Sequence, residues 1–168
     1  MGYLLGIDIG TSAVKALLLR TSGNVAGSFT TEYPLFSPRP GWSEQNPEDM
    51  WEATITAIKG VMSKCNVSGE TVLGIGLSGQ MHSSVFLDVE HEVIRPAILW
   101  NDVRTSAECR YIEETVDRKV LLEEVCNPVL EGFTLPKLLW IRNHEPENFA
   151  KVRHLVLPKD YVRYRLTG

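Results

Sequence analysis

The sequence predicts an α/β domain with a mixed sheet that opens with a three-strand antiparallel meander and is flanked by helices. Strand-length apolar runs at 3–9 and 14–20 are separated by a short turn at 10–12, which predicts a hairpin. A second turn at 22–24 leads into a third run at 25–35, in which apolar and polar residues loosely alternate. A helix, a strand and several helical segments follow. This order differs from the strict strand and helix alternation of a dinucleotide-binding fold.

A long helix is predicted after the meander. The segment at 37–42 is expected to be a loop, because its two prolines lack N–H donors and cannot extend a ladder. Asn46 then serves as the N-cap, Pro47 takes the first helical position, and two acidic residues follow at the positive end of the helix dipole. Apolar side chains recur every three or four residues, and we expect this face to pack on the sheet. Its members are Trp51, Ile55, Ile58, Met62 and Cys65.

The remaining elements are short strands followed by helices. Residues 72–77 predict a buried strand, 83–89 a further strand, and 93–100 an extended run that Pro96 interrupts. Beyond this run the sequence pattern becomes typical of helices. Helical segments are predicted at 104–117, 119–125, 134–143 and 158–167.

Length and composition restrict the class of protein. A chain of 168 residues fits one domain that buries a core without disulfides. Seventeen basic and 21 acidic residues give a net charge of −4, so there is no basic field for nucleic acid. No apolar run approaches the roughly 20 residues that span a bilayer, and the N-terminal run has no basic leader. The three cysteines lie far apart in the sequence, which is typical of reduced thiols. We expect a cytoplasmic protein without nucleic-acid or membrane partners.

The run from Asp8 to Lys15 contains the parts of a phosphate cradle. Gly10 permits close backbone approach, Thr11 and Ser12 offer hydroxyl and N–H groups, and Lys15 can reach an anion. Asp8 ends an apolar strand, where a buried carboxylate is costly unless it holds a metal, a water or a donor. It is therefore predicted to place Mg²⁺ or its bound water. The alternative is a hairpin turn in which Thr11 and Ser12 satisfy the backbone and Asp8 caps the turn.

A second polar run follows the strand predicted at 72–77. The sequence GIGLSG matches the glycine pattern of dinucleotide sites, but loop and strand follow it instead of the required helix. Gln80, Met81 and His82 combine an amide, a thioether and an imidazole. This mixture suits a polyol, because polar groups bind its hydroxyls and an apolar wall covers its C–H face. The alternative is a solvent-facing loop in which His82 is an ordinary surface histidine.

A third polar run lies at the end of the run at 93–100. Trp100, Asn101, Asp102 and Arg104 bring aromatic, amide, carboxylate and guanidinium groups into one segment. Asp102 is either part of a binding site or the N-cap of the helix that begins near Arg104. The local sequence leaves both alternatives open.

Six segments, taken in order, resemble the N-terminal part of the FGGY-family carbohydrate kinases, and within that family the xylulokinases. They are GIDIGTSAVK, PGWSEQNPEDMW, GIGLSGQMH, PAILWNDVR, GFTLPKLLWI and LPKDYVRYRLTG. Because they extend over nearly the whole chain, we expect residues 1–168 to form part of the N-terminal domain of such a kinase. The family belongs to the actin and Hsp70-like ATPase superfamily, whose ribonuclease-H-like domains begin with a three-strand meander. The resemblance therefore implies the same opening of the fold as the apolar pattern.

The resemblance implies ATP-dependent phosphorylation of a ketose, with D-xylulose converted to D-xylulose 5-phosphate as the leading case. Gluconate or another sugar is an alternative substrate, and a non-catalytic, actin-like nucleotide-binding module is an alternative role. A ribonuclease-H-like nuclease needs several carboxylates around two metals, and the sequence places only Asp8 suitably.

The resemblance also implies roles for particular residues. The residues at the ATP phosphates would be Gly10, Thr11, Ser12 and Lys15, with Asp8 helping to place Mg²⁺. Met81 and His82 match the sugar-contact pair of the family. The other residues expected in the sugar cleft are Gln80, Trp100, Asn101 and Asp102.

One part of the family's machinery has no match in this sequence. The family's general base is an Asp in a second glycine-rich phosphate motif, which no segment of the chain resembles. We therefore expect an N-terminal piece of a longer kinase that lacks the C-terminal kinase domain and is inactive alone. A homodimer is a possible state of the full-length protein.

Overall fold

The computed structural model describes residues 2–168, and the chain divides into two compact units. The first unit consists of the residues up to Leu35, of Asn46–Gln80 and of Pro158–Gly168. The second unit consists of Phe36–Gln45 and Met81–Leu157. Each unit has its own sheet structure and its own helices.

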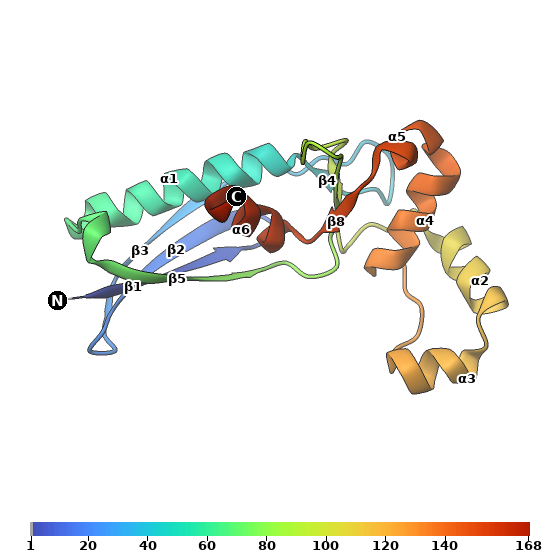
Figure 1. Cartoon of the computed structure of the whole chain (residues 1–168), viewed down its shortest axis with the longest axis horizontal. Coiled ribbons are helices and arrows are strands. Elements are labelled where there is room, and N and C mark those ends of the chain that lie inside the picture. The colour runs from blue at the N-terminus through green and yellow to red at the C-terminus, as the bar shows by residue number, and fades with distance from the viewer. Residues whose placement is uncertain (1) are drawn as a thin grey trace. The chain divides into compact units, whose positions relative to one another are not determined.

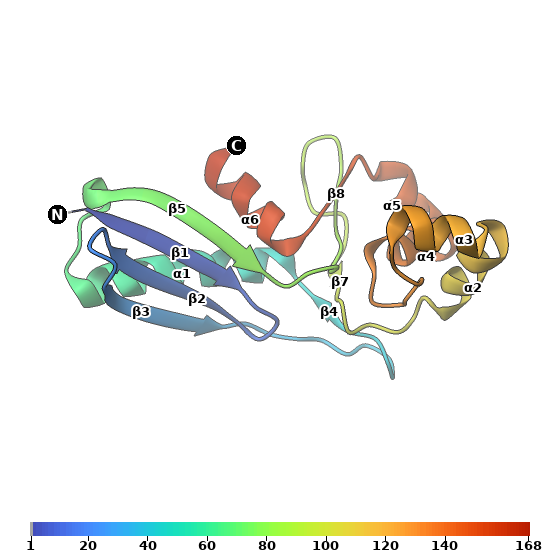
Figure 2. The same ribbon diagram turned by 90° about the horizontal axis from the view of Figure 1, so that it is seen from below.

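The first unit contains the predicted meander. Strands β1 (Tyr3–Ile9), β2 (Ala13–Arg20) and β3 (Val25–Glu32) pair antiparallel, and β5 (Val72–Gly79) joins β1 in parallel. The strand order is β3-β2-β1-β5, which Figure 2 shows from below. The mixed sheet and its opening meander are thus confirmed. Strand β3 ends before the predicted limit at residue 35, because Pro34 has no N–H group for a ladder.

Helix α1 (Pro47–Cys65) lies along this sheet and contacts β2 and β3 (Figure 1). It begins as predicted: the Asn46 side chain accepts a hydrogen bond from the Glu48 backbone N–H at 3.2 Å. It ends at Asn66, which adopts a left-handed conformation with φ of 52°. A short 3₁₀ turn (Gly69–Thr71) leads into β5, and α6 (Pro158–Thr167) packs against α1 and β5.

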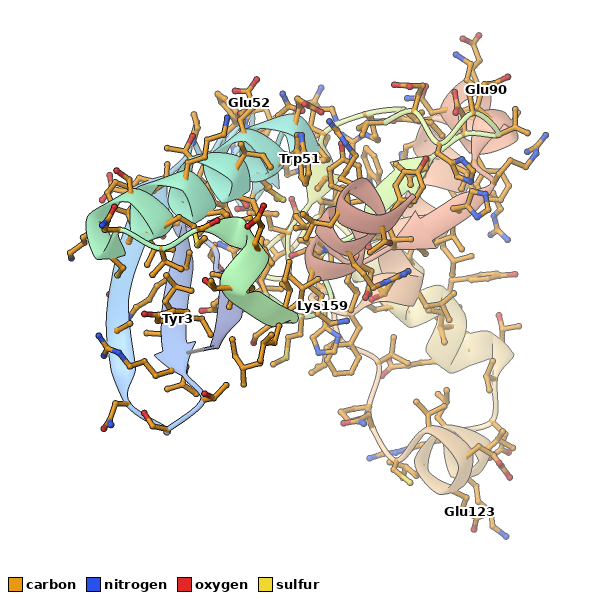
Figure 3. The ribbon with its side chains drawn as sticks, turned by 60° about the vertical axis from the view of Figure 1, so that its left-hand side comes forward. Tyr3, Trp51, Glu52, Glu90, Glu123 and Lys159 are labelled. Carbon is orange, nitrogen blue, oxygen red and sulfur yellow. The ribbon has the colours of Figure 1, made fainter. Side chains whose placement is uncertain are left out.

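The buried face of α1 is not the predicted one. The residues buried against the sheet include Met50, Ala53, Thr54, Ala57 and Val61. The predicted residues, from Trp51 to Cys65, flank this stripe and are half-buried. Small side chains let the helix approach closely: a Cβ at Gly60 would lie 2.6 Å from the Phe29 ring of β3. Figure 3 shows Glu52, on the outer face of α1, directed away from the sheet.

Strand β5 is also less buried than predicted. Leu73 is 69% exposed and Ile75 is 53% exposed. The apolar composition of 72–77 predicted a buried strand, but β5 is at the edge of the four-stranded sheet. Residues of an edge strand have neighbours on one side only, which explains the exposure.

The second unit contains short strands and most of the helices. Strand β4 (Glu44–Gln45) pairs antiparallel with β7 (Ala97–Ile98), and β6 (Val85–Leu87) pairs antiparallel with β8 (His154–Val156). The helices are α2 (Ser106–Thr115), α3 (Arg118–Val120) with the π-helical turn Leu121–Val125, α4 (Thr134–His144) and α5 (Pro146–Lys151). Their core contains Phe86, Ile98, Trp140 and Ile141.

The helices of the second unit were predicted better than its strands. The predictions at 104–117, 119–125 and 134–143 correspond to α2, to α3 with its π-helical turn, and to α4. The strands predicted at 83–89 and 93–100 shrink to three and two residues, because Pro96 interrupts the second run and the pairings of Ser84 with Ile98 and of Leu87 with Val93 are isolated bridges. Strands β4 and β8 and helix α5 were not predicted, since each is too short to carry a periodic pattern.

Candidate functional site

In the first unit, the turn between β1 and β2 is held by its own backbone. Residues Ile9 and Val14 are the last pair of the ladder, and the Gly10 N–H donates to the Ala13 carbonyl at 3.0 Å. A Cβ at Gly10 would lie 3.1 Å from that same carbonyl oxygen, so a larger residue would crowd the turn. Ser12 is exposed at the tip. The hydroxyl and N–H groups of the predicted phosphate cradle therefore lie on a fixed, accessible turn.

Tyr33 contacts this turn through hydrogen bonds from its side chain and its backbone. Its phenol donates a hydrogen bond to the Gly10 carbonyl, and its backbone N–H lies 3.4 Å from the Ser12 carbonyl. The side chain of Gln80 hydrogen-bonds to the same phenol. Burial raises the pKa of Tyr33 to about 12, so the phenol keeps its proton and remains a donor at neutral pH.

Gln80 is buried in the first unit, although the sequence placed it in one polar run with Met81 and His82. Its backbone N–H donates to the Ile9 carbonyl at 2.8 Å and continues the pairing of β5 with β1. The residue is 7% exposed, while the next residue, Met81, is 63% exposed. Gln80 was predicted to line the sugar cleft; in the structure its side chain is buried and hydrogen-bonds to Tyr33, which contacts the turn at Gly10.

Asp8 and Lys15 are cross-strand partners, and both are exposed. Asp8 is therefore not the buried carboxylate that its place at the end of an apolar strand suggested. These two residues and Ser78 line a groove of about 380 Å³ on the sheet, which has Gly6 and Gly76 among its other lining residues. Between residues 2 and 168, no three His, Cys, Asp or Glu side chains group into a metal site. A single carboxylate beside the predicted phosphate cradle is compatible with Mg²⁺, which keeps most of its waters and shares substrate phosphates.

In the second unit, His82 has a constrained backbone. Its φ is +61°, in the left-handed region that residues with a Cβ rarely adopt. Its carbonyl oxygen lies 3.3 Å from both the Thr134 hydroxyl and the Lys137 ammonium, which donate to it. Its imidazole lies 4.5 Å from the Phe133 ring, centroid to centroid. Burial, and secondarily the charge of Lys137, lowers the pKa of His82, which favours the neutral imidazole at pH 7.

The segment that begins at Trp100 is fastened at its backbone while its first side chain remains accessible. The Trp100 N–H donates to the Ser83 hydroxyl at 3.0 Å, and the Trp100 side chain is 46% exposed. A Cβ at Gly132 would lie 2.5 Å from the Trp100 carbonyl oxygen, so only glycine permits this close approach. Asn101 is exposed beside Trp100.

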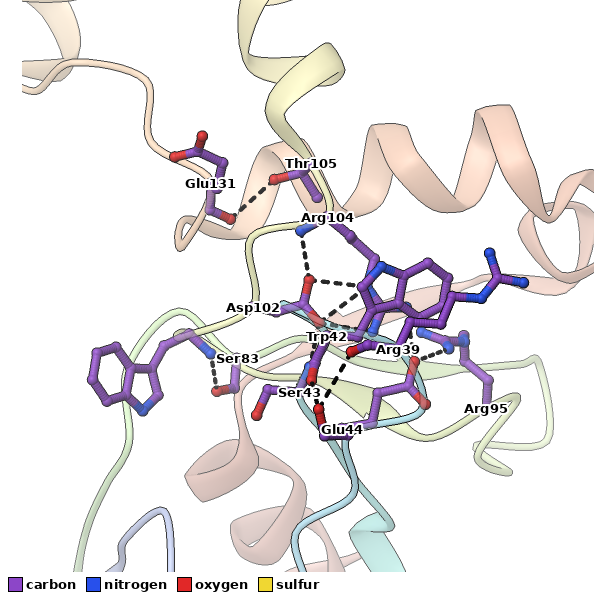
Figure 4. Close-up of polar contacts among 12 residues, drawn as sticks. Arg39, Trp42, Ser43, Glu44, Ser83, Arg95, Asp102, Arg104, Thr105 and Glu131 are labelled. Atoms are coloured by element: carbon purple, nitrogen blue, oxygen red, sulfur yellow. Dashed lines mark hydrogen bonds and ion pairs between the residues drawn. The ribbon is translucent and has the colours of Figure 1, made fainter.

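Asp102, by contrast, is fully buried within a polar network (Figure 4). Its carboxylate accepts hydrogen bonds from the Ser43 N–H at 2.6 Å and from the Arg104 N–H at 2.9 Å. The Arg104 guanidinium contacts Asp102 at 2.7 Å and Glu44 at 2.7 Å, and its central carbon lies 3.7 Å from the centroid of a Trp42 ring. Arg95 contacts Glu44 at 2.6 Å.

This network changes the interpretation of Asp102. Helix α2 begins at Ser106 with Thr105 as its N-cap, so Asp102 does not cap it. With its carboxylate engaged by Ser43 and Arg104, Asp102 shapes the segment after Trp100 and is not an accessible ligand for a sugar. The cause is a contact across 59 residues of sequence, which local patterns do not show.

Each unit therefore brings together part of the predicted site. The first unit contains the turn at 10–12 with Asp8, Lys15 and Gln80, and the second contains Met81, His82 and the Trp100 segment. Sequence reasoning missed Tyr33, Phe133 and Lys137. A lysine within the apolar run LPKLLW was the one local signal that could have drawn attention to Lys137.

Comparison with known proteins identifies the family. Residues 3–168 match the description "FGGY family of carbohydrate kinases, N-terminal domain". The chain belongs to the FGGY family of carbohydrate kinases. It is 50% identical to the xylulose kinase of Bacillus subtilis (strain 168) over 169 aligned residues, which include all of this chain and 34% of the relative.

Solved structures of sugar kinases show the same architecture. A xylulose kinase from Brucella ovis aligns with a TM-score of 0.91 and 42% identity, covering 96% of this chain and 33% of that one. A gluconate kinase from Lactobacillus acidophilus aligns with a TM-score of 0.89 and 26% identity, covering 98% and 33%. The predicted family and the actin/Hsp70-like fold class are thus confirmed. The chain spans about a third of the length of the relatives it matches.

Membership of the FGGY family supports a carbohydrate kinase and leaves the individual residue roles as predictions. Over the described part of the chain, no helix is both long enough and apolar enough to cross a membrane.

Proposed function

We propose that this chain is part of an ATP-dependent kinase that converts D-xylulose to D-xylulose 5-phosphate. The observation that carries the proposal is the 50% identity to a xylulose kinase along the entire chain. The geometry of each unit is compatible with it, since one unit offers an anion-binding turn and the other a mixed polar and aromatic surface. An ATP-consuming enzyme of central sugar chemistry also fits the predicted cytoplasmic location.

The residues of the second unit suit a polyol ligand. Neutral His82 can both donate and accept hydrogen bonds, and Asn101 adds an amide. The exposed side chains of Met81 and Trp100 supply apolar surface for the C–H face of a sugar. We assign sugar contact to these four residues and a supporting role to Asp102.

The residues of the first unit suit a phosphate ligand. The turn at 10–12 offers N–H and hydroxyl donors, and the Lys15 ammonium supplies positive charge on the neighbouring strand. Tyr33 and Gln80 hold the turn in place. When bound, ATP would supply the phosphoryl group, and Mg²⁺ near Asp8 would neutralise developing charge.

The base that removes the sugar hydroxyl proton is proposed to come from outside these residues. Phosphoryl transfer needs a group that accepts this proton while the phosphoryl group is held in line. Asp102, the carboxylate in the Trp100 segment, is buried and engaged by Arg104. Because the relatives are about three times as long as the chain, we infer that the base and the second wall of the site lie in the part of such a kinase that this chain does not span.

The experiment uses the protein encoded by the complete reading frame that contains this chain. ADP release is measured with ATP, Mg²⁺ and a panel of D-xylulose, L-xylulose, gluconate and glycerol. We expect kcat/KM to be highest for D-xylulose, and His82→Ala to lower it by about a hundredfold, as loss of positioning does. Absence of sugar-dependent ADP release from the intact protein would refute the kinase proposal.

Gluconate is the second candidate substrate, and a specific observation favours it. The gluconate kinase from Lactobacillus acidophilus aligns nearly as well as the xylulose kinase from Brucella ovis, with TM-scores of 0.89 and 0.91. The same panel separates the two sugars. A higher kcat/KM for gluconate than for D-xylulose would replace the first proposal with this one.

A further inference from the structure

Lys137 is a fully buried lysine in the second unit. It lies in the first turns of α4, and its side chain is among the largest that have no solvent exposure. Its ammonium donates to three backbone carbonyls, those of His82 at 3.3 Å, Phe133 at 3.0 Å and Gly132. These three bonds use all the donors that an ammonium group has.

A buried ammonium is expensive, so its presence at this position calls for an explanation. Removing a charge from water disfavours the charged form, and a leucine or methionine would fill the same space without that cost. The charge of Asp102 raises the proton affinity of Lys137, and the charge of Arg104 lowers it to a smaller extent. Among the described residues the Lys137 ammonium forms no ion pair with a carboxylate, and its hydrogen bonds all go to backbone carbonyls.

The carbonyls that Lys137 binds belong to the segments of the proposed sugar site. His82 is itself a proposed sugar contact, and Phe133 packs against its imidazole. Gly132 lies against the carbonyl of Trp100, the second aromatic side chain of that surface. One ammonium therefore joins the His82 segment to the 132–133 segment, and through Gly132 it supports the backbone at Trp100.

The backbone conformation of His82 indicates what these hydrogen bonds from Lys137 do. A residue with a Cβ in the left-handed region is strained by about 1–3 kcal/mol, and such strain persists where the surroundings enforce it. The His82 carbonyl accepts from Lys137 and from Thr134, so two donors on α4 hold the strained peptide. Without them the backbone would relax, and the imidazole would change its direction.

We propose that Lys137 is a positioning residue for sugar binding, which fixes the backbone of His82 and the 132–133 segment so that the imidazole and the neighbouring aromatic side chains face the sugar. The proposal rests on the proposed function, because it assigns Lys137 to the sugar site of the kinase. Lys137 acts through His82 and the backbone and does not itself touch the substrate. Its removal should therefore weaken sugar binding and leave nucleotide binding unchanged.

The kinetic test uses the complete enzyme with Lys137→Met, which keeps the length of the side chain and removes the charge. We expect the KM for the sugar to rise about tenfold, which corresponds to the loss of about 1.4 kcal/mol of binding. The KM for ATP should change by less than about twofold, because the proposed phosphate-binding turn belongs to the first unit and Lys137 to the second. The matched control is Lys119→Met, an exposed lysine whose side chain is 77% accessible. Equal changes in both KM values, or no change in either, would overturn the proposal.

A second variant covers the case in which Lys137→Met does not fold. Thr134→Val retains Lys137 and removes the other donor to the His82 carbonyl. We expect a rise of about threefold in the KM for the sugar, with the thermal midpoint nearly unchanged, because one hydrogen bond of a shared acceptor is lost. An unchanged KM for the sugar in this variant would count against the role assigned to the His82 backbone.

A third measurement does not depend on turnover. The imidazole of His82 can be titrated by NMR in the wild-type enzyme and in Lys137→Met, and the contact between the His82 and Phe133 rings followed through their nuclear Overhauser effect. We expect the variant to raise the pKa of His82, because a nearby positive charge is removed, and to weaken the ring contact. If the wild-type enzyme phosphorylates no sugar, the proposed function fails while this measurement still decides whether Lys137 orients His82. An unaltered titration and ring contact would refute the orienting role.

Discussion

The phenol of Tyr33 donates its proton to the backbone carbonyl of Gly10, and the same phenol is hydrogen-bonded by the side chain of Gln80. A residue that follows the third strand thereby fixes the turn between the first two. The turn is the proposed phosphate-binding element, so its position depends on a side chain 23 residues away. Loss of this hydrogen bond should raise the KM for ATP more than it raises the KM for the sugar.

Tyr33→Phe tests this dependence. The variant keeps the ring and removes the donor, which leaves the Gly10 carbonyl and the Gln80 amide without their shared partner. We expect a loss of about 1–2 kcal/mol in the free energy of unfolding and a rise in the KM for ATP, with a smaller effect on the KM for the sugar. Urea denaturation and steady-state kinetics on the complete enzyme measure both quantities. Tyr111→Phe, which alters an exposed ring, is the control, and equal behaviour of the two variants would contradict the role of Tyr33.

Lys137 should give the enzyme a characteristic dependence on pH. Burial lowers the pKa of its ammonium from 10.5 to about 8, against the opposing effect of Asp102. Above that pH the neutral amine has two N–H donors for three carbonyls, so we expect the KM for the sugar to rise as the pH increases through about 8. The thiol of Cys109, which also faces Lys137, has a raised pKa and stays neutral as Lys137 loses its proton. A pH profile of the KM for the sugar that is flat between pH 7 and 9 would be inconsistent with this expectation.

The loss of the Lys137 proton also changes the free energy of unfolding. A rise in pH that weakens sugar binding should make the folded protein more stable. Between about pH 8 and 10.5 the unfolded chain holds a proton on Lys137 that the folded chain has released. The free energy of unfolding therefore gains a contribution from this residue as the pH rises, in total about 3 kcal/mol over the window. Denaturation curves of wild-type protein and Lys137→Met at several pH values isolate the contribution by difference. Parallel pH dependences in the two proteins would show that Lys137 does not titrate in this range.

Asp102→Ala tests the polar network of the second unit. The substitution leaves the Arg104 guanidinium buried with one acidic partner, Glu44, and leaves the Ser43 N–H without an acceptor. Breaking a buried ion pair from one side costs about 3–5 kcal/mol, and we expect a loss of this size in the free energy of unfolding. Asp117→Ala, which removes an exposed helix cap, should cost only about 1 kcal/mol. Comparable losses in the two variants would mean that the network contributes little.

Gly60→Ala tests the close approach of α1 to the sheet. In an ordinary helix this change is stabilising by about 1 kcal/mol, because alanine favours the helix over glycine. Here the new methyl group would lie 2.6 Å from the Phe29 ring, so we expect destabilisation instead. Gly69→Ala is a matched control, since a Cβ there meets nothing within 4 Å. A stabilised Gly60→Ala variant would show that α1 and the Phe29 ring of β3 leave room for a methyl group.

Features encoded by neighbouring residues were predictable from the sequence. The meander follows from short turns between apolar runs, and the start of α1 follows from Asn46 and Pro47. The prediction of the buried face of α1 was wrong for a physical reason. It was based on the large apolar residues, whereas small residues such as Ala53 and Ala57 allow the helix to pack closely on the sheet. Periodicity alone does not distinguish these two adjacent stripes.

The exposure of the candidate site residues agrees with their predicted roles where the side chain lies at the surface. Met81, Trp100 and Asn101 are accessible, as a binding role requires. Gln80 and Asp102 look equally suitable in the sequence, but distant partners bury them: Tyr33 lies 47 residues from Gln80 and Ser43 lies 59 residues from Asp102. Lys137 was missed for the related reason that its partners are backbone carbonyls, which are the same in every sequence.

The position of β5 at the margin of its sheet affects how the chain behaves by itself. A strand with one free side has a row of backbone N–H and C=O groups available to another extended segment. The sequence VLGIGLSG contains no lysine or proline, the residues that usually block such pairing, and two of its large apolar side chains are exposed. Intermolecular strand addition at β5 is therefore a route to self-association for this chain, and its yield on refolding should fall as the protein concentration rises.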